Sequence, residues 1–122
     1  GLFCSTPMVA LSRNIGRKAA MRMLLTGDLL GATEARALGL VSDVAPASDL
    51  THTAMALATP MAEKSPSTLK IGKEAFYQQV EMDLPDAYDF AAKVMVMNML
   101  EPDAGEGIGA FIDKRAPSWK PL

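Results

Sequence analysis

The chain has 122 residues, 49% of them hydrophobic, and a formal net charge of −2 at pH 7. This length and composition fit one modest domain with its own core and argue against intrinsic disorder. The balanced charge offers no electrostatic attraction to a polyanion such as DNA, and no apolar run reaches the roughly 18 residues that a membrane-spanning helix needs. The single cysteine excludes an internal disulfide framework and fits a reducing compartment. Because residue 1 is glycine rather than methionine, we expect the chain to open inside a larger protein, or after processing or a tag.

Two short helices and one strand are predicted in the first part of the chain. Good helix formers fill 17–25 and stop near Gly27, and 32–38 follows with Gly31 as a possible N-cap and Gly39 as a C-terminal stop. The β-branched tract 40–44 ends before Pro46 and predicts one short strand.

Four further helices are predicted after residue 47. Ser48 and Asp49 can cap the first, and a second starts at Ser65-Pro66 because proline suits a first turn. Their apolar residues fall at helical spacing and predict buried stripes, namely Leu50, Ala54, Leu57, Ala58 and Met61, and then Leu69, Gly72, Phe76 and Val80.

The last two predicted helices run from about Pro85 to Leu100 and onward from Asp103. Asp103 and Glu106 have the spacing of a capping box. Lys114 and Arg115 lie at the negative pole of this last helix, whose apolar residues Ile108, Phe111 and Ile112 we expect to be buried.

Apolar side chains cover nearly the whole circumference of the helix predicted at 85–100. They are Tyr88, Phe90, Ala91, Ala92, Val94, Met95, Val96, Met97, Met99 and Leu100. A helix that is apolar all round has to be buried on all sides. We therefore expect further sequence, another subunit or both to cover it.

Motifs that carry chemistry are absent from the sequence. There is no C-x-x-C, no H-E-x-x-H, no G-x-G-x-x-G and no phosphate-binding loop, and His52 is the only histidine. No pair of carboxylates stands out as a general acid and base. The sequence predicts neither a metal site nor a catalytic residue in this chain.

The segment 32–44 has a second interpretation, because a short helix followed by Gly39-Leu40-Val41-Ser42 resembles the turn of a helix-turn-helix DNA reader. Such a reader needs a recognition helix next, with residues for phosphates and base edges. The sequence continues as Asp43-Val44-Ala45-Pro46 without a basic cluster, so DNA binding is disfavoured.

Two separated motifs resemble the crotonase (enoyl-CoA hydratase/isomerase) superfamily. Thr26-Gly27-Asp28-Leu29-Leu30, with Ala32, Ala35 and Gly39-Leu40-Val41, is similar to T-G-[DE]-x-[IL]-x-A-x-x-A-x-x-x-G-L-V. Glu106-Gly107-Ile108, Ala110-Phe111 and Lys114-Arg115 is similar to the ending E-G-x-x-A-F-x-x-K-R. The segments 57–66 and 73–75 between them also follow the family order. The resemblance implies a mainly α fold, the C-terminal helical trimerisation region of the crotonase fold, with at most one short strand and with residues 1–122 as one helical domain.

The resemblance also implies a function and an assembly. Family members bind acyl-CoA thioesters and stabilise an enolate-like oxyanion with backbone N–H groups. Those groups and the acid/base carboxylates precede this chain in family order, as does the N-terminal ββα spiral. We therefore expect an enzyme as the parent protein, an inactive chain on its own, a homotrimer or hexamer, and no nucleic-acid or membrane partner. No cofactor is implied beyond the coenzyme A thioester substrate, and the implied location is the cytoplasm, or the mitochondrial matrix in a eukaryote.

Four residues can be carried over as candidate contacts. In the family, the phenylalanine and first lysine of the A-F-x-x-K-R ending reach a CoA site, often that of a neighbouring subunit, which assigns Phe111 to the adenine or pantetheine and Lys114 to a phosphate. Core packing for Phe111 and a helix-end charge for Lys114 are the competing interpretations. Leu2 and Phe3 would line the acyl pocket.

The tract that follows departs from the family pattern, because Met8-Val9-Ala10-Leu11 replaces its glycines and their sequel. Hydratase, isomerase and thioester hydrolase therefore stay open. A self-standing helical interaction module is the alternative to an acyl-CoA enzyme.

Overall fold

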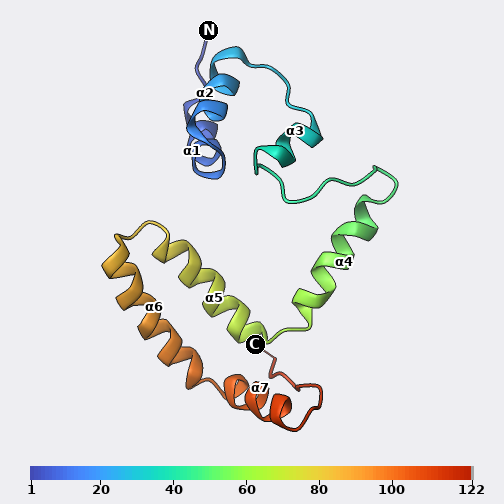
Figure 1. Ribbon diagram of the computed structural model, residues 1–122, viewed down its shortest axis with the longest axis vertical. Coiled ribbons are helices and arrows are strands. Elements are labelled where there is room, and N and C mark those ends of the chain that lie inside the picture. Colours follow the sequence, from blue (N-terminus) through green and yellow to red (C-terminus); the bar gives the residue numbers. More distant parts are fainter. Residues whose placement is uncertain (122) are drawn as a thin grey trace. The chain divides into compact units, whose positions relative to one another are not determined.

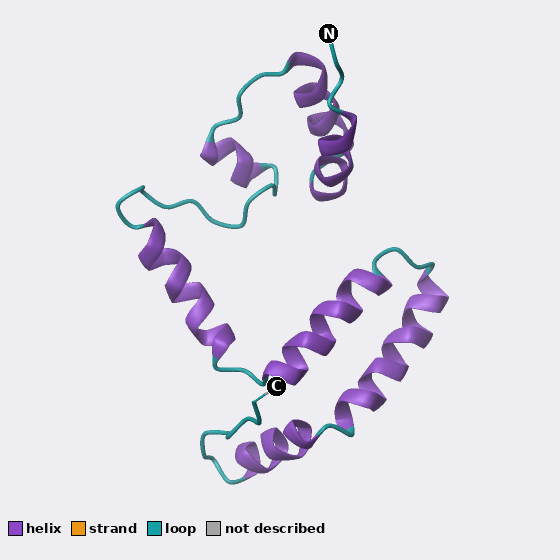
Figure 2. Ribbon diagram, turned by 180° about the vertical axis from the view of Figure 1, so that it is seen from behind, coloured by secondary structure: helices purple, strands orange, loops and turns teal. Residues whose placement is uncertain are grey.

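A computed structural model describes residues 1–121, and within that range it consists of helices joined by turns and loops (Figures 1 and 2). The helices are α1 (Ser5–Asn14), α2 (Arg17–Thr26), α3 (Ala32–Ala37), α4 (Leu50–Ala62), α5 (Pro66–Gln79), α6 (Leu84–Met99) and α7 (Pro102–Ile112). The chain forms two compact units, Gly1–Thr53 and the part that begins at Ala54, with the boundary inside α4. Within residues 1–121, every helix is too short or too polar to span a membrane.

In the first unit, glycines set the helix ends as the sequence predicts. Gly27 follows α2 with φ 68° and Gly39 follows α3 with φ 81°, both in the left-handed region that favours glycine. α1 packs against α2. The buried residues Ile15 and Ala20 lie at the turn between them and in α2. The helix α1 was not predicted, although Pro7 stands in its first turn, where proline is tolerated.

The predicted strand at 40–44 is wrong. These residues form turns and loop, and Val41 and Val44 are each 42% exposed. A strand needs a partner for its backbone N–H and C=O groups, and residues 1–121 provide no second strand. The same segment removes the helix-turn-helix interpretation, because residues 38–49 separate α3 from α4 and leave no recognition helix directly after the turn.

The second unit is built around three consecutive helices. Ser65 caps α5, with its Oγ accepting a hydrogen bond from the Thr68 N–H at 3.1 Å. α5 and α6 lie side by side, joined by the turn at 80–83, and α7 packs against α6 (Figures 1 and 2). Each helix starts with proline near its first position, as predicted for α5 and α6.

Burial is much lower than the sequence predicts. The buried apolar residues of the described chain are Ile15, Ala20, Ala35 and Ala110. The expected stripes of α4, α5 and α7 are exposed, with Leu57 at 53%, Phe76 at 58% and Phe111 at 85%. These stripes are helical faces as predicted, but the prediction that they are buried is wrong, because the packing of α5 on α6 and of α6 on α7 leaves most of their side chains exposed.

Helix α6 shows the same mismatch more strongly. No residue of α6 is buried, and six of its apolar side chains or those at its end are 56–81% exposed, namely Tyr88, Met95, Val96, Met97, Met99 and Leu100. Exposing a large apolar side chain that could be buried costs about 1.5–3 kcal/mol. The neighbouring helices α5 and α7 of the same unit therefore leave much of this helix exposed, and the cover expected from further sequence or another subunit stays a prediction.

Candidate functional site

The end of α7 carries the two candidate CoA contacts, and it does not place them as predicted. Phe111 is in the last turn of α7 and is exposed. Lys114 lies beyond the helix, which ends at Ile112, and it adopts a left-handed backbone with φ 55°. Three positions apart, the two residues would lie on adjoining parts of one helix face if α7 continued to Lys114, but the helix ends before it. The Lys114 N–H donates to the Phe111 carbonyl at 3.3 Å, so a large aromatic ring and an ammonium group project from one tight turn.

An ion pair holds the chain immediately after this turn. The guanidinium of Arg115 donates two hydrogen bonds to the Glu106 carboxylate, at 2.6 and 2.9 Å, and the Ser118 N–H donates a third at 2.7 Å. The hydrogen bond from Arg115, followed by that from Ser118, lowers the pKa of Glu106 to about 2. The same pair raises the pKa of Arg115. Glu106 therefore stays ionised at any physiological pH.

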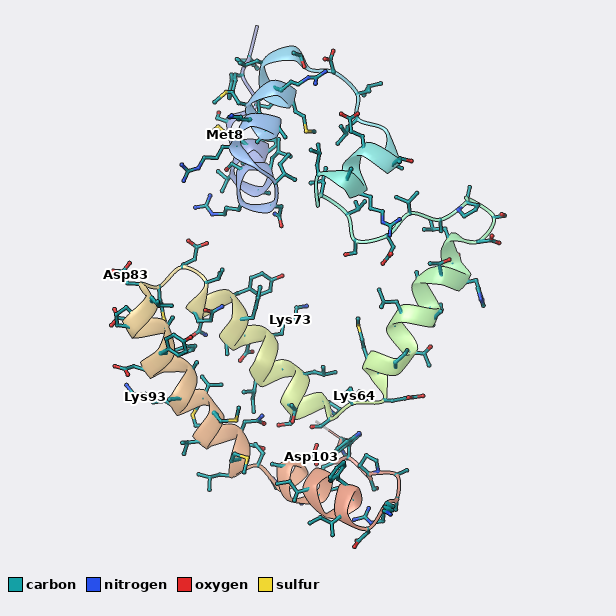
Figure 3. The ribbon with its side chains drawn as sticks, in the orientation of Figure 1. Met8, Lys64, Lys73, Asp83, Lys93 and Asp103 are labelled. Carbon is teal, nitrogen blue, oxygen red and sulfur yellow. The ribbon has the colours of Figure 1, made fainter. Side chains whose placement is uncertain are left out.

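A second carboxylate, that of Asp103, joins α7 to the start of α5. Asp103 is only 5% exposed. Its Oδ2 accepts a hydrogen bond from Ser65 Oγ and its Oδ1 accepts one from the Lys120 N–H at 3.2 Å. The predicted capping box is wrong, because α7 starts at Pro102 and the carboxylates of Asp103 (labelled in Figure 3) and Glu106 accept hydrogen bonds from residues after the helix instead.

The only tryptophan of the sequence, Trp119, packs at this end of the second unit. The Trp119 indole N–H donates to the Glu63 carbonyl at 2.7 Å, which links the chain end to the turn between α4 and α5. The ring lies directly over Gly107, where a Cβ would come within 3.3 Å of an indole carbon. A glycine on this face of α7 is what allows the ring to pack so closely.

Leu2 and Phe3, the candidate acyl-pocket residues, precede α1 in the first unit. They are 97% and 48% exposed. The Phe3 carbonyl accepts a hydrogen bond from the Ser5 N–H at 2.8 Å, at the start of α1. The two parts of the candidate site therefore belong to different units of the chain.

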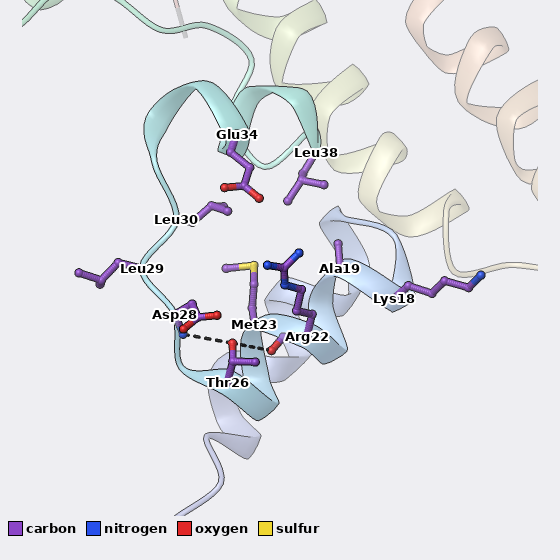
Figure 4. Close-up of a pocket in the computed structure, with 10 residues that line it drawn as sticks. All are labelled: Lys18, Ala19, Arg22, Met23, Thr26, Asp28, Leu29, Leu30, Glu34 and Leu38. Carbon is purple, nitrogen blue, oxygen red and sulfur yellow. Dashed lines mark hydrogen bonds between the residues drawn. The ribbon is translucent and has the colours of Figure 1, made fainter.

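The first unit also contains a hollow of about 330 Å³ that sequence reasoning did not find (Figure 4). It is enclosed by α2, the segment 27–31 and α3. Its polar lining includes Lys18 and Arg22 of α2 and Glu34 of α3, and its apolar lining includes Met23, Leu30 and Leu38. Thr26 Oγ1 donates to the Arg22 carbonyl and accepts from the Asp28 N–H, which fixes the segment at the end of α2. Such a mixed lining suits an amphipathic ligand or chain segment rather than proton transfer.

Within residues 1–121, no three His, Cys, Asp or Glu side chains gather as a metal site would require. Cys4 is exposed and His52 lies on an exposed part of α4. The groups that stand out are instead the anchored turn at Lys114 and its carboxylate partners.

Comparison with known proteins assigns a family to this helical arrangement. The sequence profile described as enoyl-CoA hydratase/isomerase matches residues 2–121. The chain belongs to this family. Its helices match the C-terminal helical region of the crotonase fold, as the sequence motifs predicted.

Individual relatives agree with this assignment. The chain is 47% identical over 119 residues to the rat mitochondrial enoyl-CoA hydratase domain-containing protein 3, covering 98% of this chain and 40% of the rat protein. It superposes on an enoyl-CoA hydratase from Mycobacterium smegmatis with TM-score 0.95 and 46% identity, covering 98% of this chain and 46% of that one. It superposes on human enoyl-CoA hydratase domain-containing protein 3 with TM-score 0.94 and 44% identity, covering 98% of this chain and 47% of the human one. The chain thus spans less than half the length of these relatives.

The residues that organise the end of α7 were not singled out from the sequence for the roles they have. Asp103 and Glu106 were identified as helix caps, and Ser65 as the cap of α5 alone. A buried carboxylate bridging Ser65 and Lys120 depends on residues 38 positions apart, which no local pattern reports. The available signal was the lone tryptophan close to a glycine-rich helix.

Proposed function

We propose that this chain closes the acyl-CoA pocket and mediates oligomer assembly in an enzyme of the enoyl-CoA hydratase/isomerase type. The observation that carries the proposal is Phe111, 85% exposed beside the exposed Lys114 at the end of α7, in a chain that matches this family from residue 2 to 121. An exposed ring offers an apolar face to the adenine or pantetheine of CoA. The ammonium group of Lys114 offers a point charge to a CoA phosphate.

The CoA contact is tested by three substitutions of Lys114 in the longest natural polypeptide that contains this chain. Lys114→Ala and Lys114→Gly both remove the charge, whereas Lys114→Arg keeps it. Because Lys114 has a positive φ, the glycine variant also relieves backbone strain, so it separates charge from stability. Both neutral variants should weaken binding of butyryl-CoA about fivefold, which corresponds to about 1 kcal/mol, and the arginine variant should bind as the parent does.

Lys93→Ala is the matched control, because Lys93 is an exposed lysine of α6. It should leave binding unchanged. Phe111→Ala should weaken binding with little loss of stability, because the ring is exposed rather than buried as the sequence suggested. Unaltered affinity in both neutral Lys114 variants at low salt would reduce Lys114 to a helix-end charge.

The assembly role rests on the exposed apolar side chains of α6. A homotrimer or a hexamer would cover Tyr88, Met95, Val96 and Met97, which are 57–71% exposed within the chain. Sedimentation equilibrium should therefore show a multimer. A clean monomer at high micromolar concentration would contradict this role.

The catalytic steps are assigned to residues outside this chain, and the coenzyme A thioester is the substrate rather than a resident cofactor. The chain alone should show no hydration of crotonyl-CoA, because loss of one oxyanion donor already lowers a rate by about 10²–10³. Turnover that follows the chain through repurification would contradict the proposal. The choice among hydratase, isomerase and thioester hydrolase would rest on those catalytic residues.

Two further aspects follow the relatives. The rat and human relatives are named as mitochondrial proteins, which supports a mitochondrial matrix location in a eukaryote and a cytoplasmic one otherwise. A helical interaction module without affinity for acyl-CoA is the second candidate, favoured by the same exposed α6 face. Multimers without butyryl-CoA binding in the natural polypeptide would favour that candidate.

A further inference from the structure

Residues 113–121 fold back along α7 as a strap fixed at three points. Glu106 holds the Arg115 side chain and the Ser118 N–H, Asp103 holds the Lys120 N–H, and the Glu63 carbonyl holds the Trp119 indole N–H at 2.7 Å. Two of these acceptors are carboxylates on α7 itself. Hydrogen bonds to a charged group are stronger than those between neutral groups. The strap is therefore anchored to α7 and to the turn before α5, within the second unit.

Lys114 is the residue at which the chain turns from α7 into the strap. Its φ of 55° is the one positive value outside glycine in the described residues. A left-handed backbone is unfavourable for an L-residue with a Cβ and persists where the surroundings impose it. The strap supplies that constraint, because the amides of Ser118 and Lys120 reach Glu106 and Asp103 only if the chain reverses directly after Ile112.

We propose that the strap fixes the direction of the Lys114 side chain, so that Glu106, Asp103 and Trp119 are positioning residues for the ligand contact at the end of α7. A rigid backbone at Lys114 restricts its ammonium group to one side of the turn, which lowers the entropy that ligand binding would otherwise remove. This inference rests on the proposed CoA contact of Lys114, and it assigns a role to residues that do not themselves touch the ligand.

The first part of the test opens the strap and observes it without any ligand. Glu106→Gln retains the side-chain size but removes the charge, and Gly107→Ala places a Cβ 3.3 Å from the Trp119 ring. Gly105→Ala is the matched control, because it makes the same change in the same helix with nothing within 4 Å. Hydrogen exchange of the Ser118 and Lys120 amides should accelerate about tenfold or more in Glu106→Gln and Gly107→Ala and stay unchanged in Gly105→Ala. The intraresidue amide–Hα Overhauser effect of Lys114, strongest at positive φ, should weaken in the same two variants.

The second part measures butyryl-CoA affinity in a double-mutant cycle in the natural polypeptide. Glu106→Gln should weaken binding about threefold when Lys114 is present and have no effect in the Lys114→Ala background. A merely structural strap would give the same loss in both backgrounds, and that result overturns the inference while the CoA contact stands. If Lys114→Ala itself leaves affinity unchanged, the CoA contact fails and the positioning role fails with it. Unchanged amide exchange in both Glu106→Gln and Gly107→Ala would overturn the strap directly, whatever the binding data.

Discussion

The ends of α3 and α7 use the same backbone hydrogen bonds but differ in the residue that makes the turn. After α3, the Gly39 N–H donates to the Arg36 carbonyl and the Leu40 N–H to the Ala35 carbonyl, at 3.0 and 2.9 Å. After α7, Lys114 and Arg115 make the equivalent bonds to Phe111 and Ala110, at 3.3 and 3.0 Å. This paired pattern is the Schellman motif, in which glycine usually occupies the left-handed position.

The difference shows two ways of imposing one backbone conformation. At Gly39 the absence of a side chain makes the left-handed turn inexpensive, so the local sequence is sufficient. At Lys114 the chain adopts the turn against its preference, and the contacts of Glu106 and Asp103 on the following residues compensate. The first turn is thus a local feature, whereas the second depends on tertiary contacts in its own unit.

The largest expected effect on stability concerns the end of α7, where the turn depends on tertiary contacts. Asp103→Ala should leave the Ser65 hydroxyl and the Lys120 N–H without their acceptor, and it should destabilise the second unit by about 2–4 kcal/mol. Amide exchange of α7 and the urea midpoint report the loss. Asp28→Ala, at an exposed aspartate of the first unit, should change the free energy of unfolding by no more than about 0.5 kcal/mol. Equal effects of the two substitutions would remove the distinction between the units.

Ser65→Ala should have the next largest effect and destabilise the second unit by about 2 kcal/mol. It removes the N-cap bond to the Thr68 N–H and the bond to Asp103 together, at a residue only 4% exposed. Ser12→Ala in α1 is the control. Ser12 bonds the Val9 carbonyl from an exposed position, and alanine has the higher helix propensity, so stability should stay level or rise slightly. Thermal unfolding of both variants measures the contrast, and a loss in Ser12→Ala as large as in Ser65→Ala would count against it.

Substitutions of the two turn residues, Gly39 and Lys114, should change stability in opposite directions. Gly39→Ala forces a Cβ into a left-handed backbone and should destabilise by about 1 kcal/mol, although the Cβ would meet only the Asn14 carbonyl oxygen, at 4.0 Å. Lys114→Gly relieves the same conflict and should stabilise by about 0.5–1 kcal/mol. Urea denaturation of the two variants tests the pair. A destabilised Lys114→Gly variant would mean that the lysine side chain contributes more than its backbone strain costs.

The smallest expected effect is the pH dependence of the stability that the Glu106–Arg115 ion pair contributes to the strap. Because the pKa of Glu106 is lowered from 4.5 to about 2, the contribution of its ion pair is present above about pH 4.5 and is lost as the pH falls towards 2. A carboxyl-carbon NMR titration should give a value near 2, and Arg115→Gln should return it towards 4.5. A value near 4.5 in the parent protein would show that Arg115 and Ser118 do not hold this carboxylate in solution.

Local signals in the sequence predicted the helices α2 to α7 and several of their ends, but not α1. Gly27, Gly39, Ser65 and Pro66 each act on the backbone within one turn of the chain, so their effects could be predicted without any partner. The family could also be predicted, because its motifs are runs of neighbouring residues. The failed strand at 40–44 belongs to the opposite class, since a strand exists only if another segment pairs with it.

Tertiary structure alone decided the end of α7 and the state of the apolar faces. The sequence showed that Asp103 and Glu106 were spaced as caps, but only folding brought the Ser65 hydroxyl and the Ser118 and Lys120 amides within hydrogen-bond distance of them. Likewise, the periodicity of α6 identified an apolar surface, and the packed chain showed that its own helices leave it exposed. Spacing along a chain specifies which side chains share a face, whereas the partner of that face depends on contacts between residues that are distant in sequence.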